Sequence, residues 1–480
     1  MSNQYIPRIV VAGLRGGSGK TIVSLSLISV LRQKGLAVSP FKKGPDYIDA
    51  GWLARASGVP CYNLDLFMMT PDQVTDSFCS RSGASQISVI EGNRGLYDGI
   101  DAEGSYSTAE LAKHLKSPVI LAVDCTKTTS TIAAMILGCQ KMDPEVFIGG
   151  VVLNRLATAR QEGVIRKAIE KTCGISVLGA IPRLREDPFP ERHMGLVPFQ
   201  ERTGIEESLS KVREIGEKYL DYDAIVKVAN SSGEVTASEE FEVKRSVIRE
   251  NSKLKTRDSK LQIGVIRDSA FQFYYQENFE ELEKRGAELV EVSPLRDDKL
   301  PLVDALYIGG GFPETHAITL AENSAFKQSL HKAVEDGLPV YAECGGLMYL
   351  GSTIRLEGKT YAMTGIFPLT FALEHRPQAH GYTIVRVRQA NPFFPMNTEL
   401  RGHEFHYSKV IALGSEGVSM AFEMERGKGI QDKKDGICYK NVLAAYTHLH
   451  AAGSPEWAEG MVKCAQEYKN QRAKMKDQNE

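Results

Sequence analysis

One cysteine of this chain lies in a sequence context that suits nucleophilic chemistry. Cys344 follows a predicted buried strand over 338–343, and Gly345 and Gly346 follow it at the start of a predicted helix. A strand, a tight turn and a helix hold a nucleophile at the edge of a sheet and aim backbone N–H groups at an oxyanion. A thiol near a helix N-terminus and a histidine would also have its thiolate stabilised. The alternative is a buried structural cysteine, the ordinary fate of a free cysteine inside a protein.

Four of the ten histidines form two pairs near the end of the chain and offer two kinds of chemistry. His403 and His406 form one pair, and His448 and His450 form the other. One of them could be the base for Cys344, because such a base is near in space but distant in sequence. Alternating histidines on a strand could instead bind a metal ion, although no carboxylate–histidine motif of the zinc-enzyme type accompanies them. The residues alone leave both interpretations open.

The N-terminal region contains a glycine-rich loop of the kind that binds phosphate. An apolar strand over 9–12 leads into Gly13-Leu14-Arg15-Gly16-Gly17-Ser18-Gly19-Lys20-Thr21, and an amphipathic helix follows until Gly35. Backbone N–H groups at Gly16, Gly17 and Gly19 would surround phosphate oxygens, Lys20 would neutralise the outer phosphates, and the Thr21 hydroxyl would face Mg²⁺. The loop is one residue longer than the strict G-x-x-x-x-G-K-[ST] spacing.

Acidic side chains after two further predicted strands could complete a magnesium site. Asp46 lies in a loop that also carries Lys42 and Lys43, and Glu91 ends the strand over 87–90. The two carboxylates could bind Mg²⁺ while one of the lysines contacts an anion. The alternative is an ordinary solvated turn.

Polar residues recur at the ends of the predicted strands, and this pattern predicts an α/β fold with a parallel sheet. Asn154, at the end of one such strand, could contact an adenine edge or cap the following helix. A strand over 305–308 ends in Gly309-Gly310-Gly311, where backbone can approach a ligand closely. The predicted N-terminal strands cover 9–12, 38–41, 87–90, 118–123 and 148–153.

Size and composition predict a multidomain protein of the cytoplasm. The chain has 480 residues, a net charge of −2, and eight cysteines without a C-x-x-C pair. This length favours two or three domains, and scattered cysteines favour a reducing compartment. We find no signal-peptide pattern, no apolar run that spans a bilayer, and no overall charge that attracts nucleic acid. We expect domains at 1–228 and 261–455, a polar linker at 229–260 and a helical tail at 456–480.

The N-terminal half resembles the cobyrinic acid a,c-diamide synthase family. The motifs that carry the resemblance cover 41–49, 63–65, 91–99, 107–110, 152–155 and 190–198. They imply a phosphate-loop amidoligase domain, similar in fold to dethiobiotin synthetase. In that domain Lys20 and Thr21 would hold ATP, and Asp46 and Glu91 would hold Mg²⁺. The resemblance also places three residues near the carboxylates of a tetrapyrrole, namely Tyr47, Asp49 and Asp98.

The C-terminal half resembles the class I-like glutamine amidotransferase domain of the same family. The motifs here cover 265–275, 309–314, 343–346, 402–408 and 446–450. They imply that Cys344 is the nucleophile and His448 its activating base, with backbone N–H groups around Gly311 and Gly345 as oxyanion donors. Class I amidotransferases continue H-P-E after this histidine, whereas His450 occupies the position of the glutamate. The sequence therefore assigns no third member to the pair.

The resemblance implies an enzyme that uses ATP, Mg²⁺ and L-glutamine to amidate tetrapyrrole carboxylates. The expected substrate is cobyrinate, at its a- and c-acetates, as in cobalamin biosynthesis; a homodimer is among the expected assemblies. Arg15 in the phosphate loop and Asn93-Arg94 depart from the family pattern. They leave sirohaem and nickel sirohydrochlorin open as substrates of the same chemistry. An alternative of another class is a non-catalytic partner ATPase with a phosphate loop, which would not carry an amidotransferase half.

Overall fold

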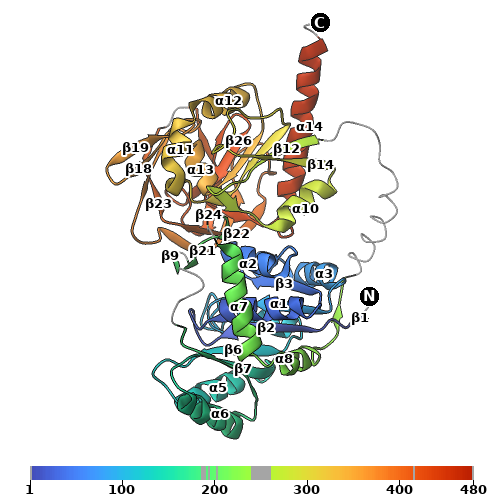
Figure 1. Ribbon diagram of the computed structural model, residues 1–480. Coiled ribbons are helices and arrows are strands. Elements are labelled where there is room, and N and C mark those ends of the chain that lie inside the picture. The colour runs from blue at the N-terminus through green and yellow to red at the C-terminus, as the bar shows by residue number, and fades with distance from the viewer. Residues whose placement is uncertain are drawn as a thin grey trace. The chain divides into compact units, whose positions relative to one another are not determined.

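The computed structural model divides into two compact units, Met1–Lys255 and Thr256–Glu480 (Figure 1). The structure describes residues 3–184, 191–192, 195–201, 204–238, 261–414 and 417–477. Residues 239–260 of the predicted linker at 229–260, and residues 190, 193 and 194 of the motif at 190–198, therefore lie outside the described residues.

The first unit is organised around a parallel sheet of seven strands in the order β4-β3-β5-β2-β6-β7-β8. These strands are buried along almost their whole length, as expected when helices cover both faces of a parallel sheet. The strands are β2 (Arg8–Gly13), β3 (Val38–Lys43), β4 (Tyr62–Leu64), β5 (Ile87–Glu91), β6 (Val119–Asp124), β7 (Ile148–Leu156) and β8 (Val177–Pro182).

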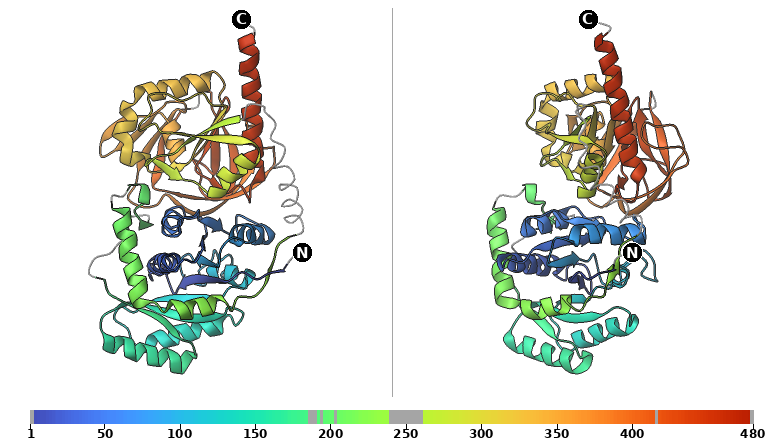
Figure 2. Two further views of the ribbon diagram at one scale, coloured as in Figure 1. Left: turned by 45° about the vertical axis from the view of Figure 1, so that its right-hand side comes forward. Right: turned by 90° about the vertical axis from the view of Figure 1, so that its right-hand side faces the viewer.

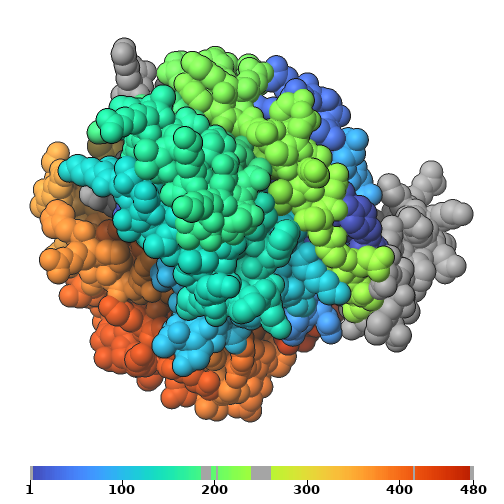
Figure 3. Space-filling view, turned by 90° about the horizontal axis from the view of Figure 1, so that it is seen from below, coloured from blue at the N-terminus to red at the C-terminus, as the bar shows by residue number. Residues whose placement is uncertain are grey.

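Helices connect these strands, and local signals set their ends. Thr70 and Gln73 form a capping box at the start of α3, with Pro71 as the first helical residue. Helices α5 and α6 pack side by side on the face seen in Figure 3. The helices are α1 (Lys20–Gln33), α2 (Ile48–Ser57), α3 (Pro71–Ser82), α4 (Thr108–His114), α5 (Thr131–Met142), α6 (Ala159–Cys173), α7 (Ile205–Tyr219) and α8 (Tyr222–Ala229).

The first unit extends past the predicted boundary at 228. Strand β11 (Val235–Thr236) pairs antiparallel with β1 (Asn3–Gln4), and Ser238 hydrogen-bonds Asp76 through its backbone N–H and its hydroxyl at 2.8 and 2.6 Å. Val235 and Ala237 are buried and alternate with exposed residues. This pattern is too short to be recognised in a stretch that is otherwise polar. Residues 229–238 are therefore part of the first unit rather than a solvated linker.

The second unit contains a ten-stranded sheet in the order β14-β12-β15-β17-β26-β25-β24-β21-β22-β27. The pairs from β14 to β26 are parallel, and those from β26 to β27 are antiparallel. The strands are β12 (Leu261–Ile266), β14 (Ala287–Val292), β15 (Ala305–Ile308), β17 (Val340–Glu343), β21 (Ala379–Val387), β22 (Glu399–His406), β24 (Ser419–Arg426), β25 (Lys434–Tyr439), β26 (Val442–Ala445) and β27 (His448–Leu449).

Smaller elements surround this sheet. A pair of short strands, β13 (Phe271–Phe273) and β16 (Gly310–Gly311), follows β12 and β15, and a four-stranded sheet has the order β19-β18-β20-β23. The remaining strands are β18 (Thr353–Leu356), β19 (Lys359–Ala362), β20 (Leu369–Leu373) and β23 (Ser408–Leu413), and the helices are α10 (Gln276–Lys284), α11 (Ala317–Glu322), α12 (Ser324–Glu335), α13 (Gly345–Leu350) and α14 (Pro455–Asp477).

The predicted α/β fold class is confirmed in both units. The tail of the chain forms α14, which runs along the second unit and projects beyond its other elements (Figure 2). Trp457, Met461 and Ala465 lie at helical spacing and are buried against the sheet, so this helix belongs to the second unit. Among the helices that the structure describes, none has the length and apolar composition needed to cross a membrane.

Candidate active sites

The glycine-rich loop of the first unit joins the end of β2 to the start of α1. Gly17 and Gly19 have φ values of 72° and 94°, a region that glycine adopts without strain. Gly19 cannot carry a side chain, because a Cβ atom there would lie 2.0 Å from Nδ2 of Asn154. The same Nδ2 donates to the carbonyl oxygen of Ser18 at 3.1 Å. Asn154 therefore supports the loop from the end of β7.

This contact changes the interpretation of Asn154. The sequence offered an adenine contact or a helix cap, but the cap of α6 is Thr158, whose hydroxyl accepts from the backbone N–H of Gln161 at 3.1 Å. The helix-cap alternative is therefore wrong. The adenine contact stays a prediction, and it would have to coexist with the hydrogen bond to the loop.

Lys20 and Thr21, the first residues of α1, point toward neighbouring strand ends. Nζ of Lys20 donates to the carbonyl oxygen of Arg94 at 2.8 Å, and the Thr21 hydroxyl donates to Oε1 of Glu91 at 2.9 Å. Burial and the nearby Lys42 ammonium lower the pKa of Lys20. A desolvated cation beside a backbone loop is well placed to receive phosphate charge.

A buried lysine holds three carboxylates together next to this loop. Nζ of Lys42 lies 2.7 Å from Asp49, 2.8 Å from Glu91 and 3.5 Å from Asp46. Burial alone would lower the pKa of Lys42, but the three carboxylates outweigh it and raise this pKa well above its usual value. Lys42 therefore compensates the negative charge of this cluster, and the expectation that Lys42 or Lys43 contacts an anion stays a prediction.

The carboxylates of this cluster differ in proton affinity. Burial raises the pKa of Glu91 to about 7 and that of Asp46 to about 6, and the Lys42 ammonium opposes both shifts. For Asp49, burial acts in the same direction, but contact with Lys42 outweighs it and lowers the pKa. Glu91 is thus the member of the cluster whose charge changes near neutral pH.

The donor set around Glu91 fits a magnesium ion bound together with phosphates. Oε2 of Glu91 is buried and has no hydrogen-bond partner, while Oε1 takes the Thr21 and Lys42 contacts. Mg²⁺ in nucleotide sites is commonly bound by one or two protein oxygens, with phosphates and water as the other ligands. In the described parts of the chain, no three His, Cys, Asp or Glu side chains form a complete metal cage. Thr21, Glu91 and Asp46 remain the predicted ligands.

The residues predicted near the tetrapyrrole have structural contacts of their own. Asp49 is the closest ion-pair partner of Lys42, and Oδ2 of Asp98 accepts from the backbone N–H of Gly95 at 2.7 Å. Tyr47 is the N-cap residue of α2. Asp98 is exposed at the surface, and the other two residues are partly exposed. No contact tests their role toward a substrate, so that role stays a prediction.

The sequence analysis missed one acidic residue at this edge of the sheet. Asp124, the last residue of β6, accepts from Arg15 at 3.1 Å and from Arg155 at 3.0 Å. Asp124 therefore holds an arginine of the glycine-rich loop next to the end of the neighbouring strand β7. The signal was available in principle, because Asp124 follows an apolar strand in the same way as Glu91 does.

In the second unit, Cys344 occupies a strained turn between β17 and α13. Its φ and ψ are 47° and −96°, a combination that a residue with a side chain rarely adopts. Its backbone N–H donates to the carbonyl oxygen of Ala445 at 2.8 Å, which fixes it at the carboxyl end of the parallel strands. The strand–turn–helix arrangement that the sequence indicated is present.

The two glycines of β16 lie between the cysteine turn and the imidazole of His448. A Cβ atom at Gly310 would lie 2.6 Å from Cε1 of His448, and one at Gly345 would lie 2.9 Å from the backbone nitrogen of Gly311. Only bare backbone fits in these positions. The β16 backbone therefore borders both His448 and Gly345, the residue after Cys344, and the catalytic roles of these residues stay predictions.

The resting state of the thiol differs from the sequence expectation. Cys344 is 6% exposed, and burial, assisted by the charge of Glu314, raises the pKa of its thiol. We expected local stabilisation of a thiolate, but desolvation of the sulfur outweighs the backbone N–H of Gly345 that favours it. Cys344 therefore rests as a thiol and requires a base to remove its proton.

His448 is held in the interior by a buried glutamate. Nδ1 of His448 lies 3.3 Å from Oε2 of Glu343, and the backbone N–H of Leu449 donates to Oε1 at 3.0 Å. Tyr307 and Tyr341 direct their hydroxyl groups at the same carboxylate, each at 3.2 Å. Burial and the charge of Glu343 raise the pKa of both tyrosines well above the usual value, so they act as donors.

The other histidines have different surroundings. The ring of His403 stacks on that of His448 with centroids 4.8 Å apart, and burial lowers its pKa well below the usual value. Nε2 of His450 faces Glu277 at 3.5 Å, and the ring of His406 stacks on Tyr446 at 3.6 Å. Tyr275 lies against both His403 and His450, so these two rings and His448 are neighbours, whereas His406 packs on Tyr446.

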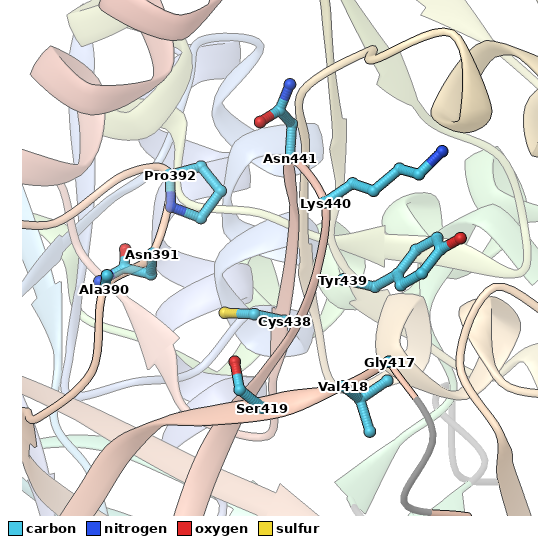
Figure 4. Close-up of a pocket in the computed structure, with 10 residues that line it drawn as sticks. All are labelled: Ala390, Asn391, Pro392, Gly417, Val418, Ser419, Cys438, Tyr439, Lys440 and Asn441. Atoms are coloured by element: carbon cyan, nitrogen blue, oxygen red, sulfur yellow. The ribbon is translucent and has the colours of Figure 1, made fainter.

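A cavity of about 530 Å³ in the second unit lies away from this chemistry (Figure 4). It is lined by Cys438, Asn441 and neighbouring residues, and the carbonyl oxygen of Asn441 accepts from Val340 at the start of β17. Cys344 follows the other end of β17, so this cavity is at the opposite edge of the sheet. A second cavity, of about 310 Å³, is lined by Tyr446 and neighbouring residues. The residue before Tyr446 is Ala445, whose carbonyl oxygen accepts from the backbone N–H of Cys344.

Comparisons with known proteins agree with this division of the chain. Residues 9–197 match the CobQ/CobB/MinD/ParA nucleotide binding domain, and residues 262–456 match the CobB/CobQ-like glutamine amidotransferase domain. The cobyrinate a,c-diamide synthase of Magnetococcus marinus is 41% identical over 94% of this chain and 96% of its own length. Those of Archaeoglobus fulgidus and Methanothermobacter thermautotrophicus are 40% and 39% identical, over 97% and 96% of this chain and 98% and 100% of their own lengths.

A nucleotide-binding unit joined to a glutamine amidotransferase unit defines a glutamine-dependent amidoligase. Within this class, the chain belongs to the cobyrinate a,c-diamide synthase family, because the similarity extends over nearly its whole length. The alternative of a partner ATPase without an amidotransferase half is wrong, since residues 262–456 form that half.

Proposed function

We propose that this chain converts the a- and c-acetate carboxylates of cobyrinate into amides, with L-glutamine as the nitrogen donor and ATP as the activating substrate. The observation that carries the proposal is that the β16 backbone borders both His448 and Gly345, the residue after Cys344, in a chain that also has a glycine-rich loop of the phosphate-binding kind. The substrate follows from the names of the relatives, which align over at least 94% of this chain.

In the second unit, the reaction would release ammonia from glutamine. His448 takes the proton of the Cys344 thiol, and the sulfur attacks the side-chain amide carbon. The developing oxyanion is stabilised by backbone N–H groups around Gly311 and Gly345. The imidazolium then gives its proton to the leaving nitrogen, the C–N bond breaks, and ammonia leaves a thioester. Water hydrolyses the thioester to glutamate and restores the thiol.

In the first unit, ATP would activate the acceptor carboxylate. A carboxylate is inert to ammonia, but transfer of the γ-phosphoryl group gives an acyl phosphate with a good leaving group. Lys20 and the backbone of Gly16, Gly17 and Gly19 stabilise the charge of the transferring group. Ammonia attacks the acyl carbon, and phosphate leaves as the amide forms. Repetition on the second acetate gives the diamide.

Several finer assignments belong to the same proposal. Mg²⁺, held through Thr21, Asp46 and Glu91, would neutralise phosphate charge and orient the γ-phosphoryl group. Tyr47, Asp49 and Asp98 would lie close to the macrocycle. We also propose a cytoplasmic location, which suits the eight free cysteines, and a homodimer, which light scattering would test.

The test separates the two half-reactions with one substitution. We expect Cys344→Ala to abolish glutamine-dependent amidation of cobyrinate, while amidation with added ammonium salts continues. The matched control is Cys438→Ala, a buried thiol at the opposite edge of the sheet, which should keep both activities. Mass spectrometry with glutamine labelled with ¹⁵N at the amide would count the nitrogens transferred. Loss of both activities in Cys344→Ala with an intact fold would contradict the division of labour.

A further inference from the structure

We propose that Glu343 is a positioning residue for His448 and supplies the carboxylate that class I amidotransferases take from the position here occupied by His450. This inference rests on the proposed roles of Cys344 and His448. The glutamate comes from the strand that carries the nucleophile, and it is separated from His448 by 105 residues.

Four hydrogen-bond donors converge on the Glu343 carboxylate. Oε1 accepts from Leu449 N–H and from the hydroxyl of Tyr341, while Oε2 faces Nδ1 of His448 and the hydroxyl of Tyr307. An ionised carboxylate offers about four acceptor positions and no donor. Glu343 is 1% exposed, and a buried carboxylate with this set of donors is fixed in one orientation.

This arrangement determines which nitrogen of His448 carries hydrogen. Because the carboxylate can only accept, Nδ1 must donate to it, and Nε2 is left as the acceptor of the neutral ring. Nε2 lies on the side of Gly310, since a Cβ atom there would be 3.3 Å from it. The base therefore presents its free electron pair toward the β16 backbone that also borders the Cys344 turn.

The carboxylate reaches the imidazole from the face of the sheet opposite the thiol. Tyr307 and Tyr341, which surround Glu343, belong to one hydrophobic cluster, whereas Cys344 belongs to the cluster on the other face. Glu343 is the last residue of β17 and Cys344 begins the turn after it, so side chains in the two clusters can approach one ring from two sides. Proton transfer from the thiol to Nε2 creates an imidazolium whose Nδ1–H already faces a negative charge.

His450, at the position where class I amidotransferases have their glutamate, is not available to orient His448. His450 is fully buried, and its Nε2 faces Glu277 at 3.5 Å. The stacked ring of His403, whose pKa is lowered by burial and by His448, stays uncharged and cannot replace the carboxylate. Glu343 is the acidic side chain that the structure places against Nδ1 of His448, at 3.3 Å.

The experiment compares Glu343→Gln and Glu343→Asp in the full chain. We expect Glu343→Gln to lower kcat for glutamine hydrolysis by roughly 10²- to 10⁴-fold, because a glutamine amide can hold the wrong tautomer of His448. The KM for glutamine should stay within about threefold, since Glu343 does not face the substrate. Glu343→Asp, which keeps the charge on a shorter side chain, should recover about tenfold or more of the lost kcat.

The control is Asp435→Asn, another buried carboxylate of the same unit. Asp435 accepts from the backbone N–H groups of Tyr446 and Thr447 at 2.9 and 3.0 Å but does not contact the imidazole. It supports the same segment of chain, so a structural effect would lower kcat in both variants alike. Equal losses in Glu343→Gln and Asp435→Asn, or a loss that appears only in KM, would overturn the inference.

Failure of this inference can be distinguished from failure of the proposed function. If Cys344→Ala abolishes glutamine hydrolysis and Glu343→Gln keeps the full kcat, only the role of Glu343 is wrong. If Cys344→Ala keeps glutamine hydrolysis, the proposed function is wrong as well. In each variant, far-UV circular dichroism and chemical denaturation of the full chain report whether the second unit is folded, since ammonia-dependent amidation depends on the first unit alone.

Discussion

The two units bury carboxylates at their functional edges but compensate the charge in opposite ways. In the first unit, Asp46, Asp49 and Glu91 surround the permanent cation of Lys42. In the second unit, Glu343 is surrounded by neutral donors and by an imidazole that gains charge only when it accepts a proton. The first arrangement keeps a cation among the carboxylates beside the glycine-rich loop. The second suits a site where charge appears transiently during a reaction.

The largest effect that separates the two sites is expected at the phosphate loop. Lys20→Met should lower ammonia-dependent amidation by about 10³-fold, because the transferring phosphoryl group loses its cation. Initial rates with ATP, cobyrinate and ammonium salt would measure this. Lys34→Met, just beyond the C-terminal end of the same helix, is the control and should keep the full rate. An active Lys20→Met would remove the loop from the mechanism.

A second test removes the fixed cation of the first unit. Lys42→Met leaves buried carboxylates without compensation, and we expect the free energy of unfolding of the first unit to fall by roughly 3–5 kcal/mol. The control is Lys332→Met, which breaks an exposed ion pair with Asp336, 3.0 Å long. It should change the free energy of unfolding by less than about 1 kcal/mol. Chemical denaturation of the full chain, followed by far-UV circular dichroism, would compare the two. Equal stability of both variants would show that Lys42 does not balance the cluster.

A third test crowds the imidazole without changing its chemistry. Gly310→Ala places a methyl group 2.6 Å from Cε1 of His448, which forces the ring to move. Displacement of a catalytic base should lower kcat for glutamine hydrolysis by about 10²-fold and leave ammonia-dependent amidation intact. Gly163→Ala in α6, where a Cβ atom has nothing within 4 Å, is the control. Unchanged glutamine hydrolysis in Gly310→Ala would show that the imidazole of His448 tolerates the added methyl group.

The smallest expected effect is a pH dependence of the first unit. Because burial raises the pKa of Glu91 to about 7, its carboxyl group is protonated below that pH and charged above it. A magnesium ligand must be charged, so the affinity for Mg·ATP should fall by up to about tenfold per pH unit as the pH drops below 7. Calorimetric titration of the wild type and of Glu91→Gln between pH 5.5 and about 8.5 would measure this. A flat profile in the wild type would contradict the assignment of Glu91.

Much of the fold could be predicted because its signals are local. The apolar strands of the first unit appear as continuous runs in the sequence, and β15 has the predicted bounds. The glycine-rich loop was also predictable, since positive φ angles at defined positions favour glycine. The Cys344 turn was predictable from the apolar strand before it and the two glycines after it. The short pairing of β1 with β11 could not be predicted, because strands of two residues show no periodic pattern in the sequence.

The sequence by itself determined the two kinds of chemistry, through a loop and a turn whose residues are adjacent in the chain. Only the tertiary structure decided that Lys42 serves three carboxylates and that Glu343 holds His448, because these partners lie on different strands. The pKa shifts of Cys344 and Glu91 also depend on burial, which arises when distant segments pack together. Composition and spacing describe neighbours along the chain, whereas charge and proton affinity depend on neighbours in space.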